Sequence, residues 1–175
     1  MIIWGINMRS KLNKKVMTDV LTGLPNRRSL LEEVNLNDKN RRAESSDTAL
    51  IVVMLDSFQI VRNKYSHRDV ILVEISNRIK TNLRSTDMVA RWAGNEFLIL
   101  LPKTNVNQAF GVAESLRHKI ADAVIEVEDF DYDITATFGV SSYHNDDTFE
   151  DTLINAGEAI IPQKTPECNR VVMVN

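Results

Sequence analysis

The sequence predicts a mixed α/β domain in which helices cover a central sheet. Residues 49–55 form an unbroken apolar run rich in β-branched side chains, which is typical of a strand buried on both faces. Two further apolar runs, at 88–92 and 97–101, flank a short polar turn and predict a β-hairpin. Segments with helical spacing of apolar residues alternate with these strands, which favours helices packed on a sheet.

The first quarter of the chain predicts two helices separated by a turn. Residues 7–19 have helical character, and the cluster at 22–26 contains both Gly and Pro, which predicts a turn. A second helix is expected from Arg27 to about residue 37, because three apolar side chains recur at helical spacing, namely Leu30, Leu31 and Val34. The polar stretch at 35–47 is expected to be a loop.

The rest of the chain continues the alternation of helices and strands. A short helix is expected at 57–65 and a longer one at 69–84, with four apolar residues on one face, namely Leu72, Ile75, Ile79 and Leu83. Pro102 ends the second strand of the hairpin. The remaining expected elements are a helix at 105–124, a strand at 134–140, a helix at 148–161 stopped by Pro162, and a closing strand at 171–174.

Length and composition fit one soluble domain. The chain has 175 residues, of which 43% are apolar and 26% charged. Its net charge of −3 is too close to neutral to suggest nucleic-acid binding. The single cysteine, Cys168, excludes an internal disulfide and suits a reducing compartment. Residues 126–151 carry nine carboxylates and no Lys or Arg, and we interpret them as a solvated acidic hairpin and loop.

The N-terminal 16 residues predict a lead-in helix or a juxtamembrane segment. Residues 1–6 are apolar and are followed by basic side chains, namely Arg9, Lys11, Lys14 and Lys15. Six apolar residues cannot span a bilayer, which needs about 20. The order of apolar and then basic residues matches the end of a membrane helix in a longer parent protein, with the basic residues on the cytoplasmic side. The expected location is therefore cytoplasmic, either alone or as the cytoplasmic domain of an inner-membrane protein.

Several motifs along residues 17–175 resemble those of one family. Residues 19–28 read Asp-Val-Leu-Thr-Gly-Leu-Pro-Asn-Arg-Arg, and residues 91–97 read Arg-Trp-Ala-Gly-Asn-Glu-Phe. An Arg-x-x-Asp motif at 84–87 precedes the second segment, while residues 56–60, 137–140 and 169–172 supply weaker matches. In order and spacing these segments resemble GGDEF domains, the diguanylate cyclase family, with a degenerate turn of Ala93, Gly94, Asn95, Glu96 and Phe97.

The resemblance implies a fold and a reaction. The fold would be a five-stranded sheet flanked by helices, as in nucleotide cyclases and polymerase palm domains. The family condenses two GTP molecules into cyclic di-GMP, so two domains must face each other as a dimer. Two metal ions usually shield the phosphates and lower the pKa of the attacking hydroxyl.

The metal ligands that the resemblance implies are missing here. The first metal carboxylate falls at Met54, whose thioether is a soft ligand, and the second falls at Asn95, whose amide is uncharged. Asp56 and Glu96 lie nearby in the sequence but align with neither position. The sequence therefore predicts that no metal is bound and that no cofactor is required. Mg²⁺ is expected only if GTP is still bound or turned over.

The nucleotide contacts implied by the resemblance are also reduced. The position of the guanine-reading Asn holds Arg62, and the following loop is shortened, so that Asp69 fits a guanine contact only with a two-residue deletion. Ala93 adds a methyl group where backbone would approach substrate. The residual candidates for nucleotide binding are Asp69, Gly94 and Lys164, while Cys168 replaces a phosphate-binding Arg.

The Arg-x-x-Asp motif is intact at Arg84 and Asp87. The resemblance implies that this motif is the inhibitory site, at which the Arg binds the guanine and phosphate edges of cyclic di-GMP and the Asp accepts hydrogen bonds from guanine. A forked guanidinium suits the first task. The same two residues would also make an ordinary surface pair after a helix.

Three functions remain open on the sequence. The favoured one is a catalytically inactive GGDEF domain that binds cyclic di-GMP at Arg84 and Asp87 and signals by conformational change. The second is an active or weakly active diguanylate cyclase, which could also bind GTP. The third is a nucleotide-free surface for dimerisation or for a protein partner. Met54 and Asn95 disfavour the second, and nothing in the sequence separates the first from the third.

Overall fold

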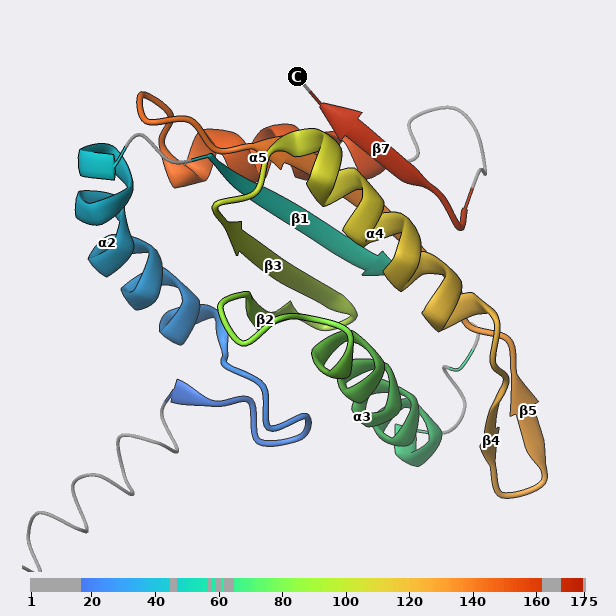
Figure 1. The fold of residues 1–175 in the computed structure, drawn as a ribbon. Helices are drawn as coiled ribbons and strands as arrows, with labels where there is room; N and C mark the ends of the chain where they lie inside the picture. The colour runs from blue at the N-terminus through green and yellow to red at the C-terminus, as the bar shows by residue number, and fades with distance from the viewer. Residues whose placement is uncertain are drawn as a thin grey trace, which may run out of the picture.

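The computed structural model describes residues 17–44, 47–56, 58, 61, 65–161 and 168–174, and its fold is a sheet with helices on both faces (Figure 1). The helices are α2 (Arg27–Glu44), α3 (Tyr65–Thr81), α4 (Val106–Ala121) and α5 (Phe149–Ile160). The strands are β1 (Thr48–Leu55), β2 (Met88–Ala93), β3 (Glu96–Pro102), β4 (Ile125–Val127), β5 (Phe130–Tyr132), β6 (Ala136–Ser142) and β7 (Val171–Val174).

The central sheet has five strands in the order β2-β3-β1-β6-β7. The strand β1 lies in the middle and pairs antiparallel with both β3 and β6, while β7 is parallel to β6. The hairpin of β4 and β5 is a separate two-stranded sheet, and it lies beside the N-terminal end of α3 (Figure 1). This arrangement confirms the predicted five-stranded sheet and places β2 and β7 at opposite edges.

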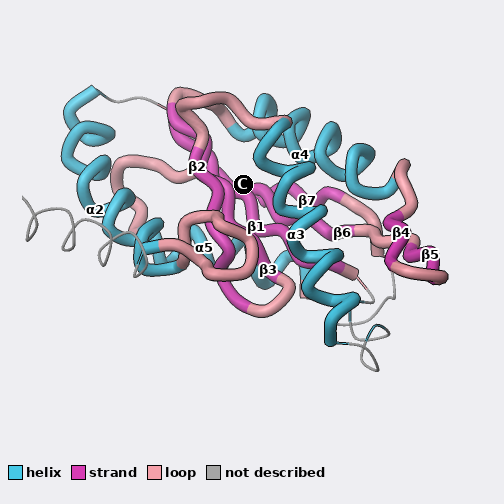
Figure 2. Tube along the Cα trace, turned by 90° about the horizontal axis from the view of Figure 1, so that it is seen from below, coloured by secondary structure: helices cyan, strands magenta, loops and turns pink. Residues whose placement is uncertain are grey.

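Alternate residues of β1 point into two different cores. Ile51 and Val53 belong to the larger cluster, which includes residues of α3 and α4, such as Ile75 and Leu116. Leu50 and Val52 belong to the second cluster, which includes residues of α2 and α5, such as Leu30 and Ala156. Because both faces are covered, every position of this strand can be apolar, as the run at 49–55 predicted. Figure 2 shows the sheet between the two pairs of helices.

One expectation about the first described helix is wrong. The polar stretch at 35–47 was expected to be a loop, but α2 continues through it to Glu44. The segment from Arg27 to Glu44 contains no Gly or Pro, so nothing interrupts the backbone hydrogen bonds. Polar side chains such as Asn, Asp, Lys, Arg and Glu are also compatible with a helical backbone, so a polar stretch by itself does not predict a loop.

The other predicted elements are present with shifted bounds. The longer helix in the middle of the chain begins at Tyr65 and ends at Thr81, earlier than the expected 69–84. The acidic segment at 126–151 contains the predicted hairpin, β4–β5. The expected lead-in segment at 1–16 lies outside the described residues, as does most of the short helix at 57–65. None of the helices in the described ranges is both long and apolar enough to cross a membrane.

Candidate functional site

The turn of Ala93 to Phe97 joins β2 to β3 and lies against the end of β1. Gly94 has a φ of 34°, in the left-handed region that favours glycine. The last paired residues of β1 and β3 are Met54 and Glu96. Beyond that pair, Leu55 N–H donates to the Asn95 carbonyl at 3.1 Å, and Asn95 Nδ2 donates to the Leu55 carbonyl at 2.9 Å. The side chain of Asn95 is therefore engaged with the backbone of β1.

The groups near this turn do not fit a hard cation. Met54 is half-buried and packs against the second core cluster. The Asn95 amide presents an N–H to the Leu55 carbonyl, and a metal ion needs such an oxygen to be open. Among the residues that the structure describes, no three His, Cys, Asp or Glu side chains converge as metal ligands. Met54 and Asn95, the two positions that the resemblance aligns with metal carboxylates, therefore do not supply the anionic oxygen ligands that Mg²⁺ prefers.

Asp56, the carboxylate that directly follows β1, is buried and accepts three hydrogen bonds. It accepts hydrogen bonds from the hydroxyls of Thr135 and Thr137, both at 2.7 Å, and from the Asn169 N–H at 2.8 Å. Burial, and next the negative charge of Asp56, raise the pKa of the Cys168 thiol. Asp56 thus joins the end of β1 to the start of β6 and to the segment before β7, which is a structural role.

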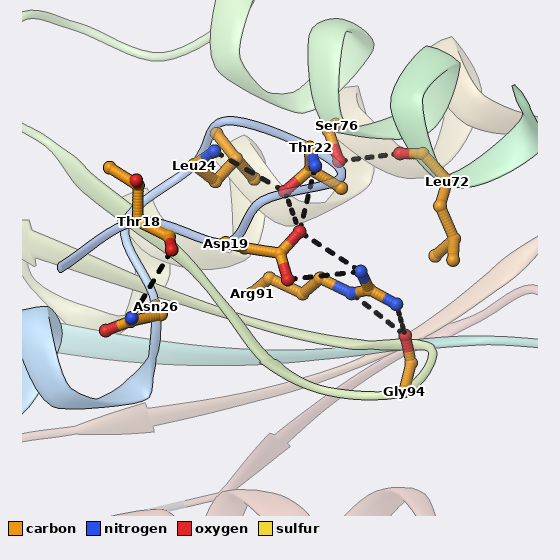
Figure 3. Close-up of polar contacts among 9 residues, drawn as sticks. All are labelled: Thr18, Asp19, Thr22, Leu24, Asn26, Leu72, Ser76, Arg91 and Gly94. Atoms are coloured by element: carbon orange, nitrogen blue, oxygen red, sulfur yellow. Dashed lines mark hydrogen bonds and ion pairs between the residues drawn. The ribbon is translucent and has the colours of Figure 1, made fainter. Parts of the chain in front are cut away.

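A second network holds the turn from the N-terminal side (Figure 3). Arg91 Nη1 lies 3.1 and 3.2 Å from the two carboxylate oxygens of Asp19, and Arg91 Nη2 donates to the Gly94 carbonyl at 2.9 Å. Asp19 also accepts from the Thr22 N–H at 2.8 Å and the Thr22 hydroxyl at 2.7 Å. Burial alone would raise the pKa of Asp19, but the bonds from Thr22 and Arg91 outweigh it and hold the pKa below its ordinary value.

Sequence reasoning missed this network, although both residues lie in segments that it quoted. Asp19 and Arg91 are 72 positions apart, and no local pattern links them. The one sequence feature that could have suggested the ion pair is that both residues are charged and lie in motifs of the same family resemblance. Their pairing fixes the position of the turn relative to the loop at 19–26.

Arg84 and Asp87 form a compact turn between α3 and β2. The Asp87 carboxylate accepts from the Arg84 N–H at 2.9 Å, and the Asp87 N–H donates to the Arg84 carbonyl at 3.1 Å. The Arg84 side chain is exposed and makes no hydrogen bond or ion pair with any described residue. The structure therefore brings these two predicted residues together and leaves the guanidinium open to solvent.

A pocket of about 640 Å³ borders this turn. It lies between the start of α2, the end of α3 and the start of β2, and Arg84 and Asp87 are among its lining residues. Its lining also includes apolar side chains, among them Leu24, Leu30, Leu83, Met88 and Val89. The volume lies in the range that small-molecule sites usually have.

The residual nucleotide contacts are not assembled into a site by the described residues. Asp69 is exposed on α3 and has no hydrogen bond or ion pair to the described part of the turn at 93–97. Lys164 and Arg62 lie outside the described residues. Gly94 is exposed, and its carbonyl is used by Arg91.

His67 on α3 is buried, with Nδ1 2.7 Å from the Tyr132 hydroxyl and Nε2 3.2 Å from Glu128. It attaches the β4–β5 hairpin to α3.

Arg117 on α4 is a cation whose side chain is already engaged. It pairs with Glu114 and lies 3.1 Å from Asn169 Oδ1, just before β7. Since β7 and β2 are opposite edges of the sheet, Arg117 cannot serve Arg84 within one chain.

Comparison with known proteins identifies relatives across most of the chain. The family model described as diguanylate cyclase, GGDEF domain, matches residues 16–170. Diguanylate cyclase DgcP of Pseudomonas aeruginosa is 30% identical over 153 residues, covering 86% of this chain and 23% of that protein. Diguanylate cyclase A of Treponema denticola is 29% identical over 171 residues, covering 94% of this chain and 46% of that protein. The chain thus spans less than half the length of either curated relative.

Solved structures show the same architecture. The diguanylate cyclase SiaD of Pseudomonas aeruginosa, solved in complex with its activator SiaC, has a TM-score of 0.86 and 29% identity, over 98% of this chain and 66% of that one. The coiled coil and GGDEF domain of DgcB from Caulobacter crescentus, solved in complex with c-di-GMP, has a TM-score of 0.90 over 99% of this chain and 93% of that one. Its identity of 18% supports the fold alone.

Proposed function

This chain belongs to the GGDEF domain family of diguanylate cyclases, and we propose that it is a catalytically inactive member that binds cyclic di-GMP through Arg84 and Asp87. Ligand binding at this turn would change the conformation of the domain and pass a signal to a second copy or to a protein partner. We place this activity in the cytoplasm, either as a separate protein or as the cytoplasmic part of a membrane protein.

The proposal of inactivity is supported by the state of the metal site. Catalysis by two metal ions needs oxygen ligands that carry negative charge, and Met54 and Asn95 supply none. The amide N–H of Asn95 occupies the Leu55 carbonyl, while the Asp56 carboxylate already accepts three hydrogen bonds. Met54 offers no oxygen, the Asn95 amide carries no negative charge, and the Asp56 carboxylate is already hydrogen-bonded, so these three side chains offer no free anionic oxygen at the end of β1.

The proposal of cyclic di-GMP binding depends above all on the environment of Arg84. Its guanidinium is exposed, and its backbone N–H is held by Asp87 at the edge of a pocket of about 640 Å³. An open guanidinium can donate to a phosphodiester or to the acceptor edge of guanine, and a nearby carboxylate can accept from guanine N–H groups. The pair is thus arranged to meet both parts of a guanine-containing dinucleotide.

Calorimetric titration with cyclic di-GMP, and separately with GTP plus Mg²⁺, tests this function. We expect cyclic di-GMP to bind and Arg84→Ala to weaken the affinity by about ten- to a hundredfold, because a charge-assisted hydrogen bond contributes about 1.5–3 kcal/mol. Arg84→Lys should also bind weakly, since an ammonium group cannot reproduce the planar fork. Met54→Asp serves as the control. Met54 lies on β1, away from the turn of Arg84 and Asp87, so this variant should bind cyclic di-GMP as the wild type does.

Three results would contradict the proposal. If the wild type does not bind cyclic di-GMP, the receptor function is wrong and a nucleotide-free interaction domain replaces it. If Arg84→Ala binds as well as the wild type, the site is not at Arg84. If the wild type converts GTP to cyclic di-GMP, the chain is an active cyclase.

A further inference from the structure

The pocket beside Arg84 and Asp87 is lined by both apolar and charged side chains. Two of the apolar ones, Leu24 and Leu30, are almost completely buried. An apolar lining favours the face of an aromatic base, because both surfaces leave water on contact. The charged side chains are the groups that could orient such a base.

The lining of the pocket includes two cationic and two anionic side chains, namely Lys80, Arg84, Glu33 and Asp87. The cations suit the phosphates of a nucleotide ligand. One oxygen of Asp87 is occupied by the Arg84 N–H. The carboxylate of Glu33 is exposed and makes no hydrogen bond or ion pair with any residue that the structure describes.

The residue next to Glu33 on α2 does have an ion-pair partner. Glu32, one position earlier on α2, pairs with Arg28 at 3.1 Å. Glu32 does not line the pocket, whereas Glu33 does. Of these two neighbouring carboxylates, the one without a partner among the described residues thus lines the same pocket as Arg84.

We infer that Glu33 recognises guanine by accepting hydrogen bonds from its N1–H and 2-amino groups. An ionised carboxylate only accepts hydrogen bonds, and its two oxygens match the two adjacent donors of guanine. Adenine offers an acceptor at N1, which a carboxylate repels, so Glu33 selects guanine against adenine. This inference rests on the proposed function, because it assigns one base contact within the same cyclic di-GMP site.

The test removes the Glu33 carboxylate from the protein and, separately, the 2-amino groups from the ligand. Cyclic di-GMP and cyclic di-IMP, which lacks the 2-amino groups, are titrated into the wild type, Glu33→Ala, Glu33→Gln and the matched control Glu32→Ala. We expect Glu33→Ala to weaken cyclic di-GMP binding by about tenfold. The preference for cyclic di-GMP over cyclic di-IMP should fall severalfold in Glu33→Ala and stay unchanged in Glu32→Ala. Glu33→Gln, which keeps one acceptor oxygen, should give an intermediate loss.

The outcomes separate this inference from the proposed function. If Arg84→Ala loses binding but Glu33→Ala does not, Glu33 has no role and the receptor function stands. If Glu33→Ala weakens both ligands equally, the contact is not specific for guanine and the inference is wrong. If the wild type binds neither ligand, both are overturned. Far-ultraviolet circular dichroism checks folding, and Glu33→Gln decides the result if Glu33→Ala does not fold.

Discussion

Asn95 and Leu55 are joined by two reciprocal hydrogen bonds, one from the Asn95 side-chain amide to the Leu55 carbonyl and one from the Leu55 N–H to the Asn95 carbonyl. Together they extend the contact of β1 and β3 one step beyond the pair of Met54 and Glu96. The Asn95 side-chain amide thus donates where a backbone N–H would continue the strand pairing, and it holds the turn on β1.

Asn95→Asp should destabilise the fold more than Asn95→Ala. A carboxylate has no N–H to donate, and it would place a negative oxygen against the Leu55 carbonyl. We expect losses of about 1 kcal/mol for Ala and about 2–3 kcal/mol for Asp in the free energy of unfolding at neutral pH. Urea denaturation followed by circular dichroism measures both. Equal stability of Asn95→Asp and the wild type would show that the amide bond contributes nothing.

The purified wild-type chain should form no cyclic di-GMP from GTP and Mg²⁺ above the level without enzyme. The physical reason is the absence of anionic oxygen ligands at Met54 and Asn95. The double change Met54→Asp with Asn95→Asp should not restore full activity, because Arg62 and the shortened loop before Asp69 still alter the implied guanine contacts. Chromatography of the reaction products decides this, and clear product from the wild type would refute the prediction.

Arg91→Ala should reduce stability at neutral pH and much less in acid. The pKa of Asp19 is lowered in the folded state, so the carboxylate contributes its stabilisation above its unfolded pKa and loses it as the pH falls through the folded value, below about pH 4. Arg91 and Asp19 are mostly buried, and we expect a loss of about 1.5–3 kcal/mol at pH 7. Urea denaturation at pH 7 and below pH 4 measures the difference between the two conditions.

Arg28→Ala is the matched control, because Arg28 and Glu32 form an exposed pair. Its effect should stay below about 0.5 kcal/mol. A loss for Arg91→Ala that is the same at both pH values would mean that the ion pair with Asp19 is not its cause.

Gly139→Ala should be strongly destabilising, while Gly157→Ala should not. A Cβ on Gly139 would clash with the carbonyl oxygen of Ala156, because α5 lies directly on β6 there. Overpacking of this kind costs about 1–3 kcal/mol or more. Gly157, in the same helix, has open space around its Cα, and Ala there should add about 0.5–1 kcal/mol of helix stability. Thermal unfolding of both variants gives the comparison, and a stable Gly139→Ala would mean that α5 can move away from the sheet.

The strands were predictable because their local composition reflects their burial. The run at 49–55 is apolar at every position since β1 is covered on both faces, and the hairpin around Ala93 to Glu96 follows from two apolar runs with a polar turn. The polar end of α2 was missed because its sequence lacks the apolar periodicity on which the prediction depended. The contacts of His67 could not be predicted from local patterns, because its partners, Tyr132 and Glu128, are more than 60 residues away.

The sequence by itself determined the alternation of elements, the family signature and the chemical identity of Met54, Asn95, Arg84 and Asp87. Only the tertiary structure decided what these residues contact. It joined the Asn95 amide to Leu55, engaged Asp56 with Thr135 and Thr137, and placed Glu33 around the same pocket as Arg84. Patterns of neighbouring residues in the sequence indicate which side chains are buried and which backbone conformation they prefer. Contacts between distant segments depend instead on strand order and helix packing, which arise only when the whole chain folds.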